Sequence, residues 1–166
     1  MNSPAASPQE AEQVSAQLNN GITLFQTLKE ILARERKYLE ERDFESFQAG
    51  TPEKASCLAD ISSHEDEFNH LLESLHIELG DKTIDRLIEK YASHQETAFA
   101  EAALQYRSFL GECDDLNTIN GRIIQRSQVN AKHLLDLIKG AVKQDQTYTR
   151  SGKTQTDGGK HPIAKA

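Results

Sequence analysis

Apolar side chains recur along most of this chain at intervals of three, four and seven residues. The first such row places Leu18, Phe25 and Leu32 seven residues apart, and a second row runs from Leu58 to Leu79 in alternating steps of three and four. The longest row keeps one heptad register from residue 99 to residue 141. This spacing predicts long amphipathic helices that pack as a coiled-coil-like bundle.

Capping signals divide the chain between these rows. Ser7-Pro8-Gln9-Glu10 has the pattern of a capping box with proline in the first turn, and Ser93 to Glu96 repeats the box. Gly50 to Pro52 and Gly80 to Asp81 are typical of a helix end followed by a new start. We therefore expect helices at about 8–49, 52–79, 82–92 and 94–142 within a bundle domain of residues 8–143.

The Asn120-Gly121 pair is ambiguous, because Asn-Gly between apolar residues is also a hairpin signal. Leu116 and Ile123 keep the heptad phase across the pair, which favours one continuous helix. Polar residues then occupy core positions of that helix at Asn120, Ser127 and Asn130. Either they specify register inside the bundle, or this part of the helix awaits a partner. The last helix, at about 74 Å, is longer than the first, at about 60 Å, which slightly favours a partner.

Composition narrows the class of protein. The chain has 166 residues, of which 37% are hydrophobic, 6% aromatic and 27% charged, which suits an elongated all-α protein. A net charge of −7 argues against binding to nucleic acid, and no apolar run is long enough for insertion into a membrane. Two isolated cysteines and no secretory signal indicate a cytoplasmic protein. Residues 1–7 and 144–166 are polar and aperiodic, so we expect both to be disordered.

Candidate catalytic or metal sites are weak. Glu67 and His70, and again Glu73 and His76, have the Glu-x-x-His spacing of di-iron bundles, but both pairs fall on one predicted helix and off its apolar stripe. A metal protein is therefore an alternative that we rank below solvated side chains. The sequence has no phosphate-binding glycine loop and no nucleophile elbow. We expect no enzyme activity, no cofactor and no metal.

The block "LNTINGRIIQRSQVNAKHLLDLIKG", followed by "TYTRSG", resembles the C-terminal signature of the FlgN family, the type III export chaperones of flagellar hook–filament junction proteins. The resemblance implies an all-α bundle that binds these proteins, prevents their premature assembly and delivers them to the cytoplasmic domain of the flagellar export gate. The client-binding residues that it implies are Asn117, Asn120, Gly121, Ile123, Ile124, Asn130, Leu134, Leu137 and Ile138. It also implies that Tyr148 and Gly152 in the tail dock to the export gate. The alternative function is a generic coiled-coil adaptor without a role in secretion.

Overall fold

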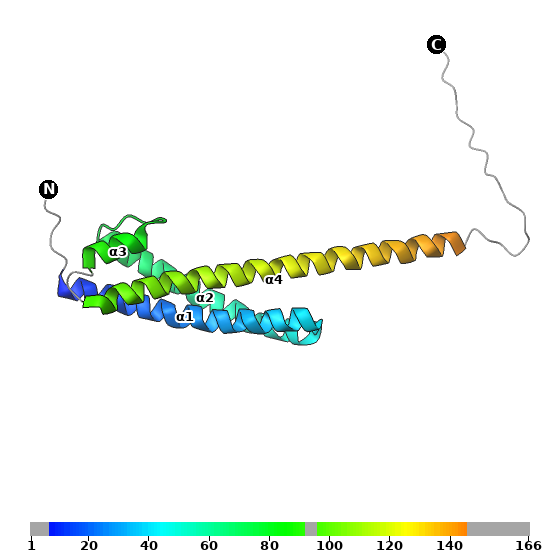
Figure 1. Cartoon of the computed structure of the whole chain (residues 1–166), viewed down its shortest axis with the longest axis horizontal. Helices are drawn as coiled ribbons and strands as arrows, with labels where there is room; N and C mark the ends of the chain where they lie inside the picture. The colour runs from blue at the N-terminus through cyan, green and yellow to red at the C-terminus, as the bar shows by residue number, and fades with distance from the viewer. Residues whose placement is uncertain (1–6, 92–95, 146–166) are drawn as a thin grey trace, which may run out of the picture. The chain divides into compact units, whose positions relative to one another are not determined.

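A computed structural model describes residues 7–91 and 96–145, with side chains described for residues 7–91 and 98–139. Four helices make up the described part of the chain: α1 (Pro8–Glu41), α2 (Phe44–Ser74), α3 (Thr83–Tyr91) and α4 (Glu96–Asp145) (Figure 1). The all-α class, with three long helices and one short helix, is confirmed. The chain divides into two compact units, residues 1–124 and residues 125–166.

The capping signal at the start of α1 has its predicted structure. The Ser7 side chain accepts a hydrogen bond of 3.2 Å from the backbone N–H of Glu10, and Pro8 is the first residue of the helix. One of the unpaired donors of the first turn is therefore satisfied, and the missing N–H of proline costs nothing there. The second predicted capping box, Ser93 to Glu96, lies largely outside the described residues.

The turn between the first two helices is eight residues earlier than predicted, so the predicted helix bounds of 8–49 and 52–79 are wrong at this junction. α1 ends at Glu41, where Arg42 adopts the left-handed conformation with φ 58°. Asp43 then caps α2, because its carboxylate accepts the backbone N–H of Ser46 at 3.0 Å. The left-handed conformation of Arg42 costs free energy because the residue is not glycine, and the N-cap hydrogen bond of Asp43 offsets part of this cost.

Gly50 and Pro52, which we expected to end a helix, lie inside α2. Proline removes one donor of the helix ladder, at a cost of about 3 kcal/mol in a helix interior. Pro52 is exposed. The buried residues of α2 all follow Pro52, at Cys57, Ile61, His64, Phe68 and Leu72, and their packing in the core outweighs this local penalty, which the sequence pattern alone does not reveal.

α2 also ends five residues before the predicted residue 79. Its last residue is Ser74, and His76 takes a left-handed φ of 57°. The backbone N–H of Ile77 reaches back to the carbonyl of Leu72 at 2.9 Å, which closes the helix as in a Schellman motif. Ile77 is buried, whereas Leu79, which we included in the apolar row, is 39% exposed. The apolar row of α2 therefore ends at Ile77, which is buried and forms part of the C-terminal cap of the helix.

The core lies in the first unit. Within residues 8–124, α1 and α2 run antiparallel side by side and the first part of α4 runs beside them, parallel to α1 (Figure 1). The predicted heptad row of α1 is buried throughout. The largest fully buried side chains of the core are Tyr91, Phe25, Phe99, Leu18, Leu32, Leu72, Leu87 and Val14.

The Asn120-Gly121 pair lies within a continuous helix, as predicted, because α4 is helical from Glu96 to Asp145. An added Cβ at Gly121 would meet nothing within 4 Å, so no close packing requires glycine at this position. Within residues 7–91 and 96–145, none of the helices combines the length and the apolarity that crossing a membrane needs.

Candidate functional site

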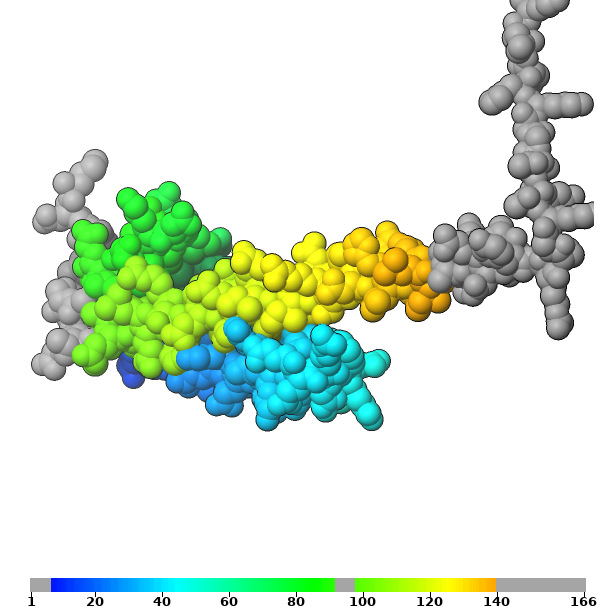
Figure 2. Space-filling view, turned by 45° about the vertical axis from the view of Figure 1, so that its right-hand side comes forward, coloured from blue at the N-terminus to red at the C-terminus, as the bar shows by residue number. Residues whose placement is uncertain are grey.

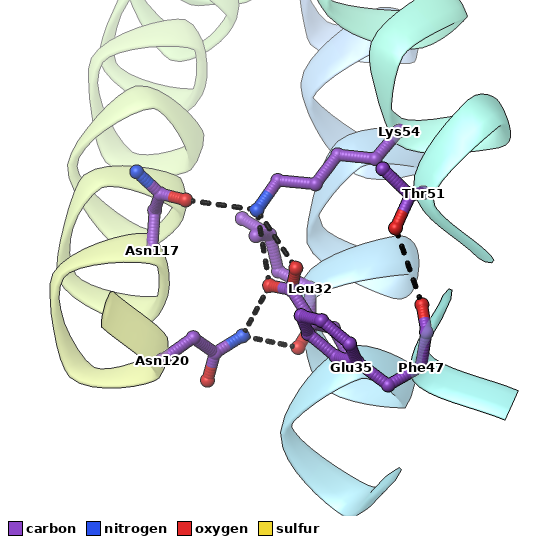
Figure 3. Close-up of polar contacts among 7 residues, drawn as sticks. All are labelled: Leu32, Glu35, Phe47, Thr51, Lys54, Asn117 and Asn120. Atoms are coloured by element: carbon purple, nitrogen blue, oxygen red, sulfur yellow. Dashed lines mark hydrogen bonds and ion pairs between the residues drawn. The ribbon is translucent and has the colours of Figure 1, made fainter. Parts of the chain in front are cut away.

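Asn120 lies at the centre of a polar cluster that joins three helices (Figure 3). Its side-chain N–H₂ donates to the backbone carbonyl of Leu32 at 2.9 Å and to the Glu35 carboxylate at 2.8 Å, both on α1. The Lys54 ammonium from α2 donates to both carboxylate oxygens of Glu35 at 3.0 Å and to the Asn117 side-chain oxygen at 3.1 Å. We call Glu35, Lys54, Asn117 and Asn120 the three-helix polar cluster.

This cluster specifies how α4 packs on α1. Asn120 is 1% exposed, and Glu35 and Lys54 are largely shielded, with side chains 12% and 21% exposed. Hydrogen bonds to charged groups are worth about 1.5–3 kcal/mol, so a shift of α4 along α1 would lose them and leave a buried amide unpaired. Within the first unit, the end of α1 and the start of α2 lie beside α4 (Figure 2).

Asn120 therefore belongs to the interior of the bundle, and our placement of it on an open client-binding surface is corrected. Of the two explanations for the polar residues at core positions, Asn120 fits the first, in which the residue specifies the register of α4 inside the bundle. The Asn117 side chain is exposed, but its oxygen accepts from Lys54. Gly121 is also exposed, and Ile123 and Ile124 are half-buried.

The second unit presents a different surface. Asn130 is exposed there, and Ser127, although half-buried, forms no side-chain hydrogen bond among the described residues. Five large apolar side chains between residues 129 and 138 are 48–69% exposed. These residues, the apolar segment of α4, are Val129 (48%), Leu134 (60%), Leu135 (54%), Leu137 (69%) and Ile138 (59%).

Three members of this segment, Leu134, Leu137 and Ile138, were among the client-binding residues that the FlgN resemblance implied. Sequence reasoning missed Val129 and Leu135, which lie off the seam in the heptad register. The adjacent pair Leu134-Leu135 could have indicated Leu135. Adjacent residues point in different directions from a helix, so a narrow apolar stripe cannot bury both leucines. Tyr148 and Gly152 lie outside the described residues.

A cluster around His64 was not anticipated. The imidazole is 3% exposed, stacks on Phe68 with ring centroids 5.9 Å apart, and lies beside Tyr106. Neither ring nitrogen has a hydrogen-bond partner among the described residues, and burial lowers the pKa of His64, which favours the neutral ring. Gly21 makes room for this packing, because a Cβ there would lie 2.3 Å from Tyr106 Cε2.

The remaining candidate groups are structural or solvated. Cys113 is 4% exposed and its thiol donates to the carbonyl of Phe25 at 3.3 Å, as expected for a small buried side chain. Burial also raises the pKa of this thiol. The side chains of His70 and Glu73 are exposed, with His70 Nδ1 3.8 Å from Glu73 Oε2. Within the described residues, no three His, Cys, Asp or Glu side chains gather closely enough to hold a metal ion.

The fold and the apolar segment of α4 define a helical-bundle protein with exposed apolar side chains on a helix, of the kind that pack against another helix. The chain matches the model of the family described as "FlgN protein" over residues 1–156, and it belongs to the FlgN family. This confirms the resemblance seen in residues 116–152. FlgN proteins are flagellar export chaperones that bind flagellar proteins, and the family is not known for enzyme activity. No curated protein and no solved structure matches the chain.

Proposed function

We propose that this chain is a cytoplasmic export chaperone for flagellar hook–filament junction proteins, and that it binds them through the apolar segment of α4. The observation that carries the proposal is the exposure of five large apolar side chains between residues 129 and 138 in a chain of the FlgN family. An apolar patch of this kind marks an interaction surface more often than it marks bare solvent-facing helix. Ile123 and Ile124 would extend the contact.

The energetics suit a reversible complex. Full burial of a leucine or isoleucine side chain contributes about 1.5–3 kcal/mol, and these side chains retain half or more of that area for a partner. Part of the gain is offset by the freedom that the partners lose on association. A client helix laid along this segment would therefore bind at micromolar rather than picomolar affinity. Asn130, exposed beside the apolar residues, would keep the free helix soluble.

Such binding would cover client segments that otherwise assemble too early, and release would occur at the cytoplasmic domain of the flagellar export gate. The tail supplies a candidate for gate docking. Tyr148 is the only aromatic residue after Phe109, and Gly152 follows it closely. An aromatic side chain in a polar segment offers a pocket a large contact at small cost in entropy.

Client binding is tested by changing Leu134→Ser and Leu137→Ser together and co-purifying untagged junction protein with the tagged chain. We expect loss of the client with an unchanged thermal transition, because both side chains are exposed in the free protein. The matched control is Leu79→Ser with Leu104→Ser, which changes two leucines that are 39% and 45% exposed outside the segment. Equal loss of client in the control would refute the proposed surface.

Gate docking is tested by Tyr148→Ala. We expect normal client co-purification and reduced secretion of junction proteins, since the change removes only the docking side chain. Normal secretion by this variant would exclude Tyr148 from delivery. Loss of client binding as well would show that Tyr148 belongs to the client surface.

A generic adaptor remains a second candidate, because Leu134 and Leu137 occupy coiled-coil core positions and are exposed. In that case the segment pairs with a second copy of itself. Sedimentation distinguishes the two functions. The adaptor predicts a dimer that Leu134→Ser with Leu137→Ser converts to monomer, with no effect on secretion.

A further inference from the structure

The first unit has a groove lined by none of the residues of the apolar segment of α4. It is bounded by α2 on one side and α4 on the other, and its volume is about 310 Å³. Its floor is the apolar face of α1, formed by Phe25, Leu28 and Leu32, which are 2%, 7% and 0% exposed. The groove is therefore lined below by the core itself.

Two leucines stand on opposite walls of this groove. Leu58 on α2 is 44% exposed, although it begins the apolar row predicted for that helix, and Leu110 on α4, one position after the core position Phe109 of the heptad register, is 42% exposed. Stripe residues on neighbouring helices usually bury each other's surface. Here α2 and α4 leave both side chains about half exposed on either side of the α1 face.

The length of the groove fits a short helix. One end is closed by Lys54 and Asn117, which hydrogen-bond across it (Figure 3). The other end is at Glu65, which lies close enough to Tyr106 to contribute to that residue's raised pKa. From residue 54 to residue 65 of α2 the rise is about 16 Å, or about three helical turns.

The charges along the walls indicate the chemistry of a partner. Glu65 on α2 and Asp114 on α4 line the groove, are exposed, and form no ion pair among the described residues. Among the described residues that line it, Lys54 is the one cationic side chain, and it is already bonded to Glu35 and Asn117. A partner that brings Lys or Arg beside its apolar residues would satisfy both carboxylates, whereas an acidic partner would be repelled.

We propose that this groove is a second docking surface, and that it takes an amphipathic helix of another protein whose narrow apolar stripe is flanked by Lys or Arg. Apolar side chains spaced i, i+4 and i+7 would enter between Leu58 and Leu110 over the α1 floor. The basic side chains would reach Glu65 and Asp114 on either wall. This surface does not depend on client binding by residues 129–138.

A synthetic peptide pair tests the proposal directly. The first is a capped, fluorescein-labelled peptide of about 18 residues, long enough to form helix, with Leu at i, i+4, i+7 and i+11, Lys beside each Leu and Ala elsewhere. The second carries Glu in place of every Lys. Binding to the full chain is measured by fluorescence anisotropy at low and moderate salt. We expect the Lys peptide to bind at least about tenfold more tightly than the Glu peptide.

Because the chain has a net charge of −7, attraction of any cation must be separated from docking in the groove. Glu65→Lys with Asp114→Lys should reverse the preference, so that the Glu peptide binds more tightly. The matched control, Asp66→Lys with Glu101→Lys, changes two exposed acidic residues that do not line the groove and should keep the original preference. Equal effects of the two pairs would overturn the proposal.

The apolar part has its own variants. Leu58→Ser with Leu110→Ser should weaken the Lys peptide by about tenfold or more with unchanged helicity, and Leu134→Ser with Leu137→Ser should not weaken it. The opposite result would place the peptide on the apolar segment of α4 and refute a second surface. A dimer of the chain alone that Leu58→Ser with Leu110→Ser converts to monomer would also refute it, since a second copy would then fill the groove.

Discussion

The substitution Asn120→Asp changes a hydrogen-bond donor into a charge at the most buried point of the three-helix polar cluster. Asn120 donates to the Leu32 carbonyl and to the Glu35 carboxylate. A carboxylate has nearly the same shape but can only accept, so both bonds become contacts between oxygens. Steric fit is therefore preserved while the electrostatics are reversed.

The magnitude follows from these two contacts. Loss of the bond to the Glu35 carboxylate costs about 1.5–3 kcal/mol, and loss of the bond to the Leu32 carbonyl about 0.5–1.5 kcal/mol. Two carboxylates about 4 Å apart repel by about 4 kcal/mol at an effective dielectric constant of 20, part of which the Lys54 ammonium offsets. We expect a total loss of about 3–6 kcal/mol, against about 5–15 kcal/mol for the stability of a typical domain.

Urea unfolding followed by far-UV circular dichroism at pH 7 measures this loss. The control is Asn130→Asp, the same change at an exposed position of α4, which should stay within about 0.5 kcal/mol of the unsubstituted protein. Equal stability of the two variants would refute the structural role of Asn120.

Acidification provides a second test of the same substitution. Burial beside Glu35 raises the pKa of the introduced carboxylate above its unfolded value of about 3.9, because both burial and the like charge disfavour ionisation. The penalty is therefore complete above the folded pKa and shrinks as the pH falls through it. The gap between Asn120→Asp and Asn130→Asp should narrow between pH 7 and pH 4, and a constant gap would contradict the electrostatic explanation.

The other stability predictions concern Gly21, Gly121 and His64. Gly21→Ala should lower the free energy of unfolding, measured in urea, by about 1–3 kcal/mol, because the new Cβ would lie 2.3 Å from a Tyr106 ring carbon. Gly121→Ala should raise the free energy of unfolding by about 0.5–1 kcal/mol, because a Cβ there meets nothing and alanine favours helix over glycine. Equal effects would contradict the packing at Gly21. Burial lowers the pKa of His64 in the folded protein below the unfolded value of about 6.5, so the unfolded state takes up a proton first and stability falls as the pH drops below about 6.5. The melting temperature should fall over that range, and His64→Leu should flatten the fall while His70→Gln leaves it unchanged.

The helices and the buried heptad rows were predictable because they depend on local spacing. Leu18, Phe25 and Leu32 recur at the period of a packed helix face, and all three are buried. The cap at Ser7 follows equally from chemistry within one turn. The FlgN signature in residues 116–152 was also readable, because it consists of residue types at set intervals.

The placement of the first turn depended on tertiary structure. Gly50 and Pro52 carry the stronger local signals, but the chain turns at Arg42, which bears the strain of a left-handed conformation. Packing of the buried residues of α2 that follow Pro52 outweighs a local penalty of about 3 kcal/mol. A sum over distant contacts is not visible in any short stretch of sequence.

The roles of the polar core positions also depended on the fold. Asn120 and Asn130 are both asparagines at core positions of one heptad register, so the sequence pattern cannot tell which of them is buried. Asn120 is buried because Glu35 and Leu32, some 85 residues earlier in the chain, come within hydrogen-bonding distance of it. Asn130 is exposed. The sequence by itself determined the helices and their apolar faces, whereas only tertiary structure decided which polar residue lies in the core, because burial depends on neighbours that are distant along the chain.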